Sequence, residues 1–359
     1  MKTVILEENR QMRIGDLLLP ELESDECRIK VVSAGICSSD VQRAFEGGAH
    51  VYPLVMGHEM AGEVVVCGAS ATADFALGDR VVVFPLLPCG RCGECRDKHY
   101  ARCRSYDYYG SRRNGGFAQY LNVKSWNLLP LPNNLSFDDA ALVEPVAVVV
   151  HALDRAGVLN PSEAKNSEIV IVGAGFLGLI AVQILHLLRP ATPVTLIDRN
   201  AYKLEIGAAS GAKTHLLASD DDWQDFLNDS RSRFQVAIEA TGVPDTFRRS
   251  VELACPGGTV MWMGNISAKL DLPQALVSSI LRKELTILGT WNSSYDGRKP
   301  SDWTKVLDLM VQGFRPASLV TDFVGLDGLP GILERLYAHK KRIERHEILK
   351  AIVHPNKKD

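Results

Sequence analysis

The chain has 359 residues, too many for one compact core, and this length predicts two domains. Hydrophobic residues make up 46% of the sequence and the formal net charge is −3, a combination that argues against intrinsic disorder. Because 40 Lys and Arg residues are matched by 43 Asp and Glu residues, a nucleic-acid binder that relies on excess positive charge is also excluded.

The first residues of the sequence do not resemble a secretory signal, because Glu7 and Glu8 interrupt it before an apolar stretch develops. One uncharged segment, residues 169–188, is long enough to span a membrane. It starts with a β-type run, continues with three regularly spaced glycines and ends in a helical pattern, so we reject a membrane span. A cytoplasmic protein without membrane contact is expected.

Residues 1–135 have the pattern of a β domain. Short apolar runs, such as residues 28–32 and 80–84, alternate with turn signals such as Gly47-Gly48 and residues 77–79. A cysteine-rich lobe interrupts this pattern.

The lobe contains the motif Cys89-x2-Cys92-x2-Cys95-x7-Cys103. Thiolates at this spacing can turn toward one zinc ion, and four of them leave no open coordination position, so the motif predicts a structural zinc. An iron–sulfur cluster also takes four thiolates, and unligated or disulfide-bonded cysteines are a further alternative. A chain of this length with clustered cysteines is more typical of metal thiolates in a reducing compartment than of a disulfide-stapled secreted domain.

From Ser136 the pattern changes to that of an α/β domain. Ser136 followed by acidic residues 138 and 139 is typical of a helix start. Apolar runs and helical stretches then alternate as far as residue 288, which predicts a parallel sheet covered by helices. The candidate strands are residues 169–172, 194–197, 235–238, 259–263 and 286–288. The tail contains a further expected helix over residues 302–312 and is expected to fold back onto the first domain.

A glycine fingerprint follows the first of these strands, within the segment Gly173-Ala174-Gly175-Phe176-Leu177-Gly178. In such a motif the first glycine permits a tight turn, the second lets a pyrophosphate approach the backbone, and the third lets helix and strand pack closely. A glycine-rich turn without a ligand is the alternative interpretation.

The residue that ends the next strand indicates that the ligand is a dinucleotide. Asp198 lies 20 residues after Gly178, where a carboxylate binds the adenosine ribose. Because Asp198 would repel a 2′-phosphate, NAD is favoured over NADP, although the adjacent Arg199 weakens this inference slightly. Lys203 is a further candidate contact to the ribose, or else a surface residue.

Three scattered segments contain other metal-ligating residue types. They are residues 35–40, which include Cys37, Ser39 and Asp40; residues 57–59, which include His58 and Glu59; and residues 143–145, which include Glu144. Each side chain alone is more often structural than functional, and their spacing does not establish that they assemble.

Taken together, these motifs resemble those of the zinc-dependent medium-chain alcohol dehydrogenases over essentially the whole chain. The shared features are the segments 35–40, 57–59 and 144–145, the four-cysteine lobe, the glycine fingerprint and Pro256-Gly257-Gly258. Within this family the sequence is most similar to the polyol dehydrogenases, and among these to the galactitol-1-phosphate 5-dehydrogenases. The segments that carry this closer similarity are residues 48–53, 83–89, 106–113 and 281–286.

The resemblance implies a fold and a division into domains. The fold is α/β, with a GroES-like β domain over residues 1–150 that is completed by residues 290–359, and a Rossmann NAD-binding domain over residues 151–289. The resemblance also places the cofactor in the cleft between the domains and implies a homo-oligomer, either a dimer or a tetramer.

The resemblance also assigns roles to the scattered residues. Cys37 and His58 are expected to bind a catalytic zinc, and Glu59 and Glu144 to be ligands or near-ligands, in addition to the structural zinc of the lobe. A Cys₂His site serves alcohol dehydrogenase, whereas this chain has glutamate in place of the second cysteine. Ser39 stands where the family has a proton-relay hydroxyl, and Asp40 is expected to orient His58.

The expected function is hydride transfer from a secondary alcohol of a sugar alcohol, or of its phosphate, to NAD, giving a keto sugar. Arg112 and Arg113 are adjacent guanidinium groups and are the candidate substrate residues: they could bind a substrate phosphate, or equally form salt bridges or an oligomer contact. The rival functions are a threonine or other amino-alcohol dehydrogenase and, more distantly, a non-catalytic protein that binds zinc and NAD.

Overall fold

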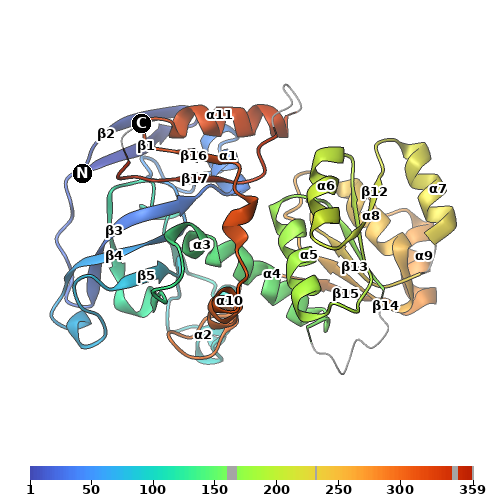
Figure 1. Ribbon diagram of the computed structural model, residues 1–359, viewed down its shortest axis with the longest axis horizontal. Coiled ribbons are helices and arrows are strands. Elements are labelled where there is room, and N and C mark those ends of the chain that lie inside the picture. Colours follow the sequence, from blue (N-terminus) through green and yellow to red (C-terminus); the bar gives the residue numbers. More distant parts are fainter. Residues whose placement is uncertain (160–167, 231–232, 342–346, 358–359) are drawn as a thin grey trace. The chain divides into compact units, whose positions relative to one another are not determined.

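The structure is a computed structural model that describes residues 1–159, 168–230, 233–341 and 347–357 (Figure 1). The chain forms two compact units. The first contains residues 1–147 and 293–359, and the second contains residues 148–292.

The described part of the first unit is built on a seven-stranded sheet with the order β16-β17-β3-β4-β5-β9, in which β8 also pairs with β3. Its long central strands are β3 (Glu26–Gly35) and β4 (Glu59–Cys67), which run antiparallel. The other strands of this sheet are β5 (Arg80–Val83), β8 (Tyr120–Lys124), β9 (Leu128–Pro130), β16 (Asp322–Val324) and β17 (Ala351–Val353). Strand β17 pairs antiparallel with β3 through Val353 and Ala34, so the C-terminal tail is part of the first unit.

Two small sheets and several helices complete the first unit. The strands are β1 (Lys2–Glu8), β2 (Gln11–Asp16), β6 (Leu86–Leu87) and β7 (Asp107–Tyr108). The α-helices are α1 (Ser38–Phe45), α2 (Gly93–Arg96), α3 (Phe137–Ala141), α10 (Asp302–Val311) and α11 (Leu329–Lys340), and α4 (Val143–Arg155) crosses the boundary between the units. The short 3₁₀ helices are η1 (Ala71–Ala73), η2 (Tyr100–Arg102), η3 (Ser125–Asn127) and η4 (Pro316–Leu319).

Alternating burial explains the core of this unit. In β3 the side chains of Ile29 and Val31 are buried, whereas those of Arg28 and Lys30 are more exposed, because successive residues of a strand face opposite sides of the sheet. The buried face of β3 packs in one cluster with residues from β1, β4, α1 and α11. The two ends of the sequence thus share one hydrophobic core.

The second unit is a six-stranded parallel sheet, within the described residues, with the order β12-β11-β10-β13-β14-β15. Its strands are β10 (Ile169–Val172), β11 (Val194–Asp198), β12 (Lys213–Leu216), β13 (Phe234–Glu239), β14 (Ala254–Trp262) and β15 (Thr286–Gly289). Its helices are α5 (Phe176–Leu188), α6 (Ala201–Ala209), α7 (Asp220–Ser230), α8 (Pro244–Leu253) and α9 (Gln274–Lys283). This strand order, counted along the unit as 3-2-1-4-5-6, is that of a Rossmann sheet, which confirms the predicted fold class.

The uncharged segment 169–188 forms β10 and α5, and both belong to the core of the second unit. All four residues of β10 are buried, as is typical of a central parallel strand covered on both faces. Among the described residues, none of the helices has the length and apolar character that crossing a membrane requires.

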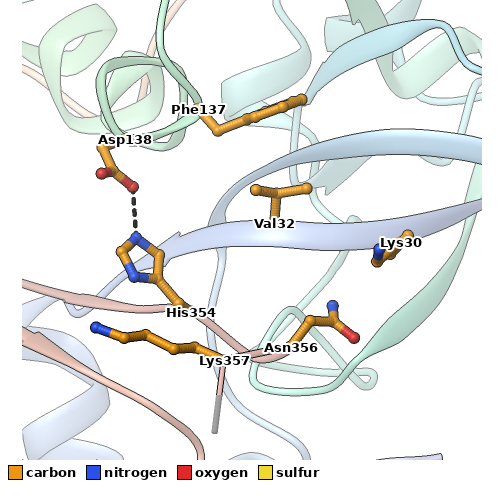
Figure 2. Close-up of a pocket in the computed structure, with 7 residues that line it drawn as sticks. All are labelled: Lys30, Val32, Phe137, Asp138, His354, Asn356 and Lys357. Atoms are coloured by element: carbon orange, nitrogen blue, oxygen red, sulfur yellow. Dashed lines mark hydrogen bonds and ion pairs between the residues drawn. The ribbon is translucent and has the colours of Figure 1, made fainter.

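The C-terminal segment contacts the start of α3 through a polar interaction at the rim of a small cavity. His354 Nε2 lies 2.7 Å from Asp138 Oδ1, and the Ser33 hydroxyl donates to the same oxygen at 2.7 Å. Figure 2 shows this direct contact between His354 and Asp138 among the residues that line the cavity. The cavity is lined by Lys30, Val32, Phe137, Asp138, His354, Asn356 and Lys357, which include none of the predicted site residues.

This contact predicts an acid-sensitive contribution to stability. Burial opposes ionisation of Asp138, but the hydrogen bonds from His354 and Ser33 outweigh it and lower the pKa of this carboxyl. A carboxyl whose pKa is lower in the folded state stabilises the fold above its unfolded value of about 3.9, and this stabilisation is lost as the pH falls through the folded value. We therefore expect Asp138→Asn to cost about 1 kcal/mol at pH 7 and less at pH 3, where the stabilisation from the ionised carboxyl is already being lost. Urea unfolding at both pH values measures this, and an equal cost at both would contradict it.

Candidate active site and metal centres

Cys37 stands at the start of helix α1, where it is the N-cap residue. Its backbone N–H donates to Asp40 Oδ2 at 3.0 Å, and this reciprocal capping arrangement fixes the turn that presents the thiol. Cys37 is partly buried, whereas Asp40 is completely buried.

His58 and Glu59 come to Cys37 through the pairing of β3 with β4. Glu59, the first residue of β4, is paired with Gly35, two residues before Cys37. As a result one ligand atom from each of Cys37, His58 and Glu59 lies within 4.8 Å of the other two. The structure therefore brings together three of the four residues that the sequence proposed for a catalytic metal.

Glu144, the fourth predicted ligand, is not in this group of described residues, although its carboxyl is buried nearby. It lies in the first turn of α4, and the Tyr108 hydroxyl donates to Glu144 Oε1 at 3.0 Å. Burial raises the pKa of Glu144, and the charge of Glu59 adds to this effect while His58 opposes it. The ring of Tyr108, which holds Glu144, also lies 5.9 Å from the His58 ring between centroids, so Tyr108 connects Glu144 to the group.

The charges around His58 favour a cation in this site. Burial alone would lower the pKa of His58, but the Asp40 carboxylate, 3.5 Å from His58 Nδ1, outweighs it and the pKa lies well above the usual value. Burial likewise opposes ionisation of Asp40, but His58 and Arg43 lower the pKa of this carboxyl. A partly buried thiol together with a buried imidazole and a buried carboxylate forms a donor set that suits zinc. These residues therefore fit the metal that the sequence implied, and Asp40 lies where it can orient the His58 ring.

Lys350 is a residue of this site that the sequence analysis missed. Its ammonium group, almost completely buried, donates to Glu59 Oε1 at 2.7 Å and to the Ile36 carbonyl at 3.0 Å, and it lies 2.5 Å from Glu59 Oε2. The only signal in the sequence is a single lysine inside the apolar run 348–353. Its partner is 291 positions away along the chain, so only the pairing of β17 with β3 reveals the contact.

Ser39 lies two residues after Cys37 in the first turn of α1. The guanidinium group of Arg43 donates to Ser39 Oγ at 2.9 Å and to Asp40 Oδ1 at 3.0 Å. Because the Ser39 oxygen already accepts a hydrogen bond, its own proton is available for another acceptor.

The four cysteines of the lobe converge on one point. The sulfur atoms of Cys92 and Cys95 are 3.5 Å apart, and Cys89–Cys95 and Cys92–Cys103 are each 3.9 Å apart. A tetrahedron with Zn–S distances of about 2.3 Å has edges of about 3.8 Å, so the four sulfurs match the shell of one zinc ion. Hydrogen bonds from the backbone of Arg91 and residue 92 lower the pKa of Cys89 to about 6, which favours the thiolate. The lobe therefore fits a structural metal.

The glycine fingerprint forms the turn between β10 and α5. Gly173 has a φ of +111°, which favours glycine, and a side chain at Gly178 would collide with the Gly173 carbonyl. At Gly175, the N-cap of α5, the space where a side chain would stand is open. Phe176 and Leu177 follow as the first residues of the helix. This open helix N-terminus fits a pyrophosphate, as the sequence proposed.

Asp198 ends β11 beside this turn. Its Oδ2 accepts a hydrogen bond from the Ala174 N–H at 2.7 Å, and its Oδ1 accepts one from the Asn200 N–H at 2.9 Å. Lys203 lies in the first turn of α6, and burial lowers its pKa although the charge of Asp198 opposes this. Arg199 is exposed. Asp198 and Lys203 thus stand next to the turn that would hold a dinucleotide.

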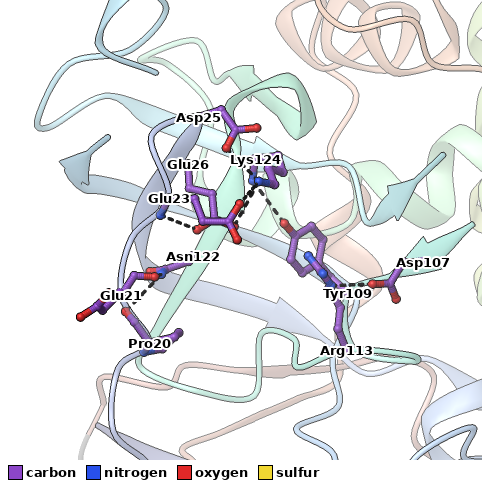
Figure 3. Close-up of polar contacts among 10 residues, drawn as sticks. All are labelled: Pro20, Glu21, Glu23, Asp25, Glu26, Asp107, Tyr109, Arg113, Asn122 and Lys124. Carbon is purple, nitrogen blue, oxygen red and sulfur yellow. Dashed lines mark hydrogen bonds and ion pairs between the residues drawn. The ribbon is translucent and has the colours of Figure 1, made fainter. Parts of the chain in front are cut away.

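The structure places the two predicted phosphate-binding arginines in different surroundings. Figure 3 shows Arg113 directed toward Asp107, with which it forms an ion pair at 2.7 Å, and close to the Tyr109 ring. Arg112 donates to the Tyr106 carbonyl at 2.6 Å and lies 4.0 Å from the centre of the Tyr106 ring. Among the described residues Arg112 forms no ion pair with a carboxylate.

The positive charges of Arg112 and Arg43 act on the same histidine, His50. Burial lowers the pKa of His50, and the charges of Arg112 and Arg43 lower it further. Arg43 in turn holds Ser39.

Comparisons with known proteins agree with these features. Residues 23–133 match the model of the alcohol dehydrogenase GroES-like domain, and residues 177–312 match that of the zinc-binding dehydrogenases. The chain is 36% identical over 316 residues to galactitol 1-phosphate 5-dehydrogenase of Escherichia coli K12, with coverage of 87% of this chain and 89% of that protein.

Solved structures show the same similarity. The crystal structure of galactitol-1-phosphate dehydrogenase from Escherichia coli superposes with a TM-score of 0.86 at 32% identity, covering 99% of this chain and 100% of that one. A zinc-binding dehydrogenase from Sinorhizobium meliloti 1021, determined bound to NADP, superposes with a TM-score of 0.85 at 28% identity, covering 99% of each chain.

Proposed function

Because the chain belongs to the zinc-dependent medium-chain alcohol dehydrogenase family, we propose that it oxidises a secondary alcohol of a hexitol phosphate, such as galactitol 1-phosphate, with NAD as hydride acceptor. The product is the corresponding keto sugar. The observation that carries this proposal is the convergence of Cys37, His58 and Glu59 in a buried group next to the relay position of Ser39.

Two zinc ions serve this function. Cys37 and His58 hold the catalytic ion, with Glu59 or Glu144 as the carboxylate donor, and the four cysteines of the lobe hold the structural one. When bound, the catalytic zinc supplies Lewis acidity that favours loss of the hydroxyl proton, and NAD supplies the hydride acceptor.

The residues of the chain orient the metal ligands, move the substrate proton and bind the dinucleotide. Asp40 orients His58, and Lys350 holds the Glu59 carboxylate in place. The Ser39 hydroxyl, fixed by Arg43, receives the substrate proton and passes its own proton outward. The Gly173–Gly178 turn binds the pyrophosphate, and Asp198 binds the two ribose hydroxyls, which favours NAD because a 2′-phosphate would meet a carboxylate.

The test is a substrate screen with the zinc-loaded enzyme. Hexitols, hexitol phosphates and threonine are each supplied with NAD or NADP, and reduced cofactor is measured at 340 nm. We expect the highest kcat/KM with a hexitol phosphate and NAD. Turnover of threonine alone would support the amino-alcohol rival instead, and the lack of any turnover with all three classes would overturn the proposal.

Arg112 offers a sharper prediction about the phosphate. A charge-assisted hydrogen bond contributes about 1.5–3 kcal/mol, so Arg112→Ala is expected to lower kcat/KM for the phosphate ester about 10–100-fold while activity with the free hexitol is unchanged. Arg113→Ala is the matched control, because Arg113 is already paired with Asp107, and a change under about 3-fold is expected. Equal losses with both substrates would show that Arg112 has no specific role with phosphate.

A further inference from the structure

Two cysteines that the proposed function does not use lie side by side on adjacent strands of the central sheet of the first unit. Cys27 lies near the start of β3 and Cys67 is the last residue of β4. They are directly paired in the antiparallel register, and their sulfur atoms are 3.1 Å apart. Neither cysteine belongs to the four-cysteine lobe or to the Cys37 group.

The backbone at this position suits a covalent bond between the two sulfurs. The Gly68 N–H donates to the Glu26 carbonyl at 2.8 Å, so residues 26 and 68 form a hydrogen-bonded pair. Positions alternate along an antiparallel ladder, and Cys27 and Cys67 therefore form a non-hydrogen-bonded pair, with Cα atoms about 4.5 Å apart. This spacing is within the range of about 4.4–6.8 Å that disulfides adopt.

We propose that Cys27 and Cys67 are a redox-active dithiol that oxidises reversibly to a cross-strand disulfide. The oxidant is a small disulfide such as oxidised glutathione. The Cys67 thiolate attacks it, breaking its S–S bond, forming a mixed disulfide and releasing one thiolate. Cys27 then attacks the Cys67 sulfur, forms the Cys27–Cys67 bond and releases the second thiolate. The two protein thiols lose two electrons to the oxidant, and their two protons convert the released thiolates to thiols.

The burial of the two residues sets the order of these steps. Cys67 is partly exposed, so a small oxidant reaches it first, whereas Cys27 is completely buried and can react only with Cys67. Burial, the neighbouring Cys67 and the carboxylates of Asp74 and Asp79 raise the pKa of Cys27. Cys27 therefore stays protonated and protected against direct attack, and it is the slower, resolving thiol, which loses its proton as it attacks the Cys67 sulfur.

The disulfide would enclose the segment that carries the candidate active site. Residues 27–67 include Cys37, His58 and Glu59, yet the cysteine pair is at the opposite end of the β3–β4 ladder from the Gly35–Glu59 pair. Closing this loop restricts the unfolded chain without moving the ligand residues. Oxidation is therefore expected to stabilise the first unit.

The experiment uses the full-length zinc-loaded protein, treated with oxidised glutathione and then alkylated and digested for mass spectrometry. We expect a peptide pair joined through Cys27 and Cys67, which dithiothreitol separates. The oxidised protein should unfold at a temperature about 5–10 °C higher than the reduced protein. Cys67→Ser should abolish both the joined peptides and the shift, and Cys255→Ser, at a partly exposed cysteine of the other unit, should keep both.

Recovery of Cys27 and Cys67 as separately alkylated peptides after oxidation would overturn the proposal. So would a joined peptide that forms only after the protein is denatured, because the folded β3–β4 pairing would then have no part in it. A shift in unfolding temperature that persists in Cys67→Ser would also contradict it.

Discussion

Replacing Cys37 by serine is expected to lower kcat roughly 1,000-fold. This is the largest loss of activity that we expect from a single substitution in this chain. The side chain is one of three that converge in the buried ligand group, and a hydroxyl is a much poorer zinc ligand than a thiolate. Losing several kcal/mol of transition-state stabilisation corresponds to about this factor. The variant should also bind one zinc ion per chain fewer than the parent.

Binding of the dinucleotide separates a catalytic role of Cys37 from a structural one. The glycine fingerprint belongs to the other unit, so NADH binding, measured by fluorescence, should change less than about 2-fold in Cys37→Ser. Cys255→Ser is the matched control and should retain both turnover and zinc content. Loss of NADH binding and of the folded state together with turnover would show instead that Cys37 has a structural role.

Replacing Lys350 by methionine is expected to have the largest effect on stability. Methionine is similar in length but leaves the Glu59 carboxylate buried without its cation, and breaking a buried pair costs about 3–5 kcal/mol. Urea unfolding measures this cost. Adding Glu59→Gln to the variant removes the unpaired charge, so the double variant should regain part of the lost stability.

An exposed ion pair provides the control for this experiment. Lys2 and Asp327 are 2.5 Å apart but both side chains are more than a third exposed, so Lys2→Met should cost less than about 1 kcal/mol. A cost for Lys350→Met as small as that of the control would show that Glu59 does not depend on Lys350. In that case another group would have to neutralise the Glu59 carboxylate.

The elements that could be predicted from the sequence are those whose signal is local. The buried run of β10 and the glycines that follow it were sufficient to predict a strand, a turn and a helix that opens with a phosphate-binding backbone. The four lobe cysteines lie within fifteen residues, so their spacing alone indicated a shared metal. In both cases the residues that act together are close neighbours in the chain.

Strands without an apolar run were harder to predict. Strand β12, with the sequence Lys213-Thr214-His215-Leu216, was not among the predicted strands. It is the outer strand of its sheet and none of its residues is fully buried, so it lacks the hydrophobic run that identified the others. Strand β14 begins at Ala254, five residues earlier than predicted, because its first part contains Pro256, Gly257 and Gly258, which are turn signals in a sequence.

The sequence by itself determined the family, the fold class, the residue types available for metal binding and the dinucleotide fingerprint, because each depends on motifs read within short segments. The tertiary structure decided which of those residues meet. Strand pairing brings Glu59 beside Gly35 and close to Cys37, the C-terminal strand delivers Lys350 to Glu59, and the sheet register sets Cys27 opposite Cys67. These contacts join residues far apart in the chain, and the pattern along any one segment carries no information about its partner across the sheet.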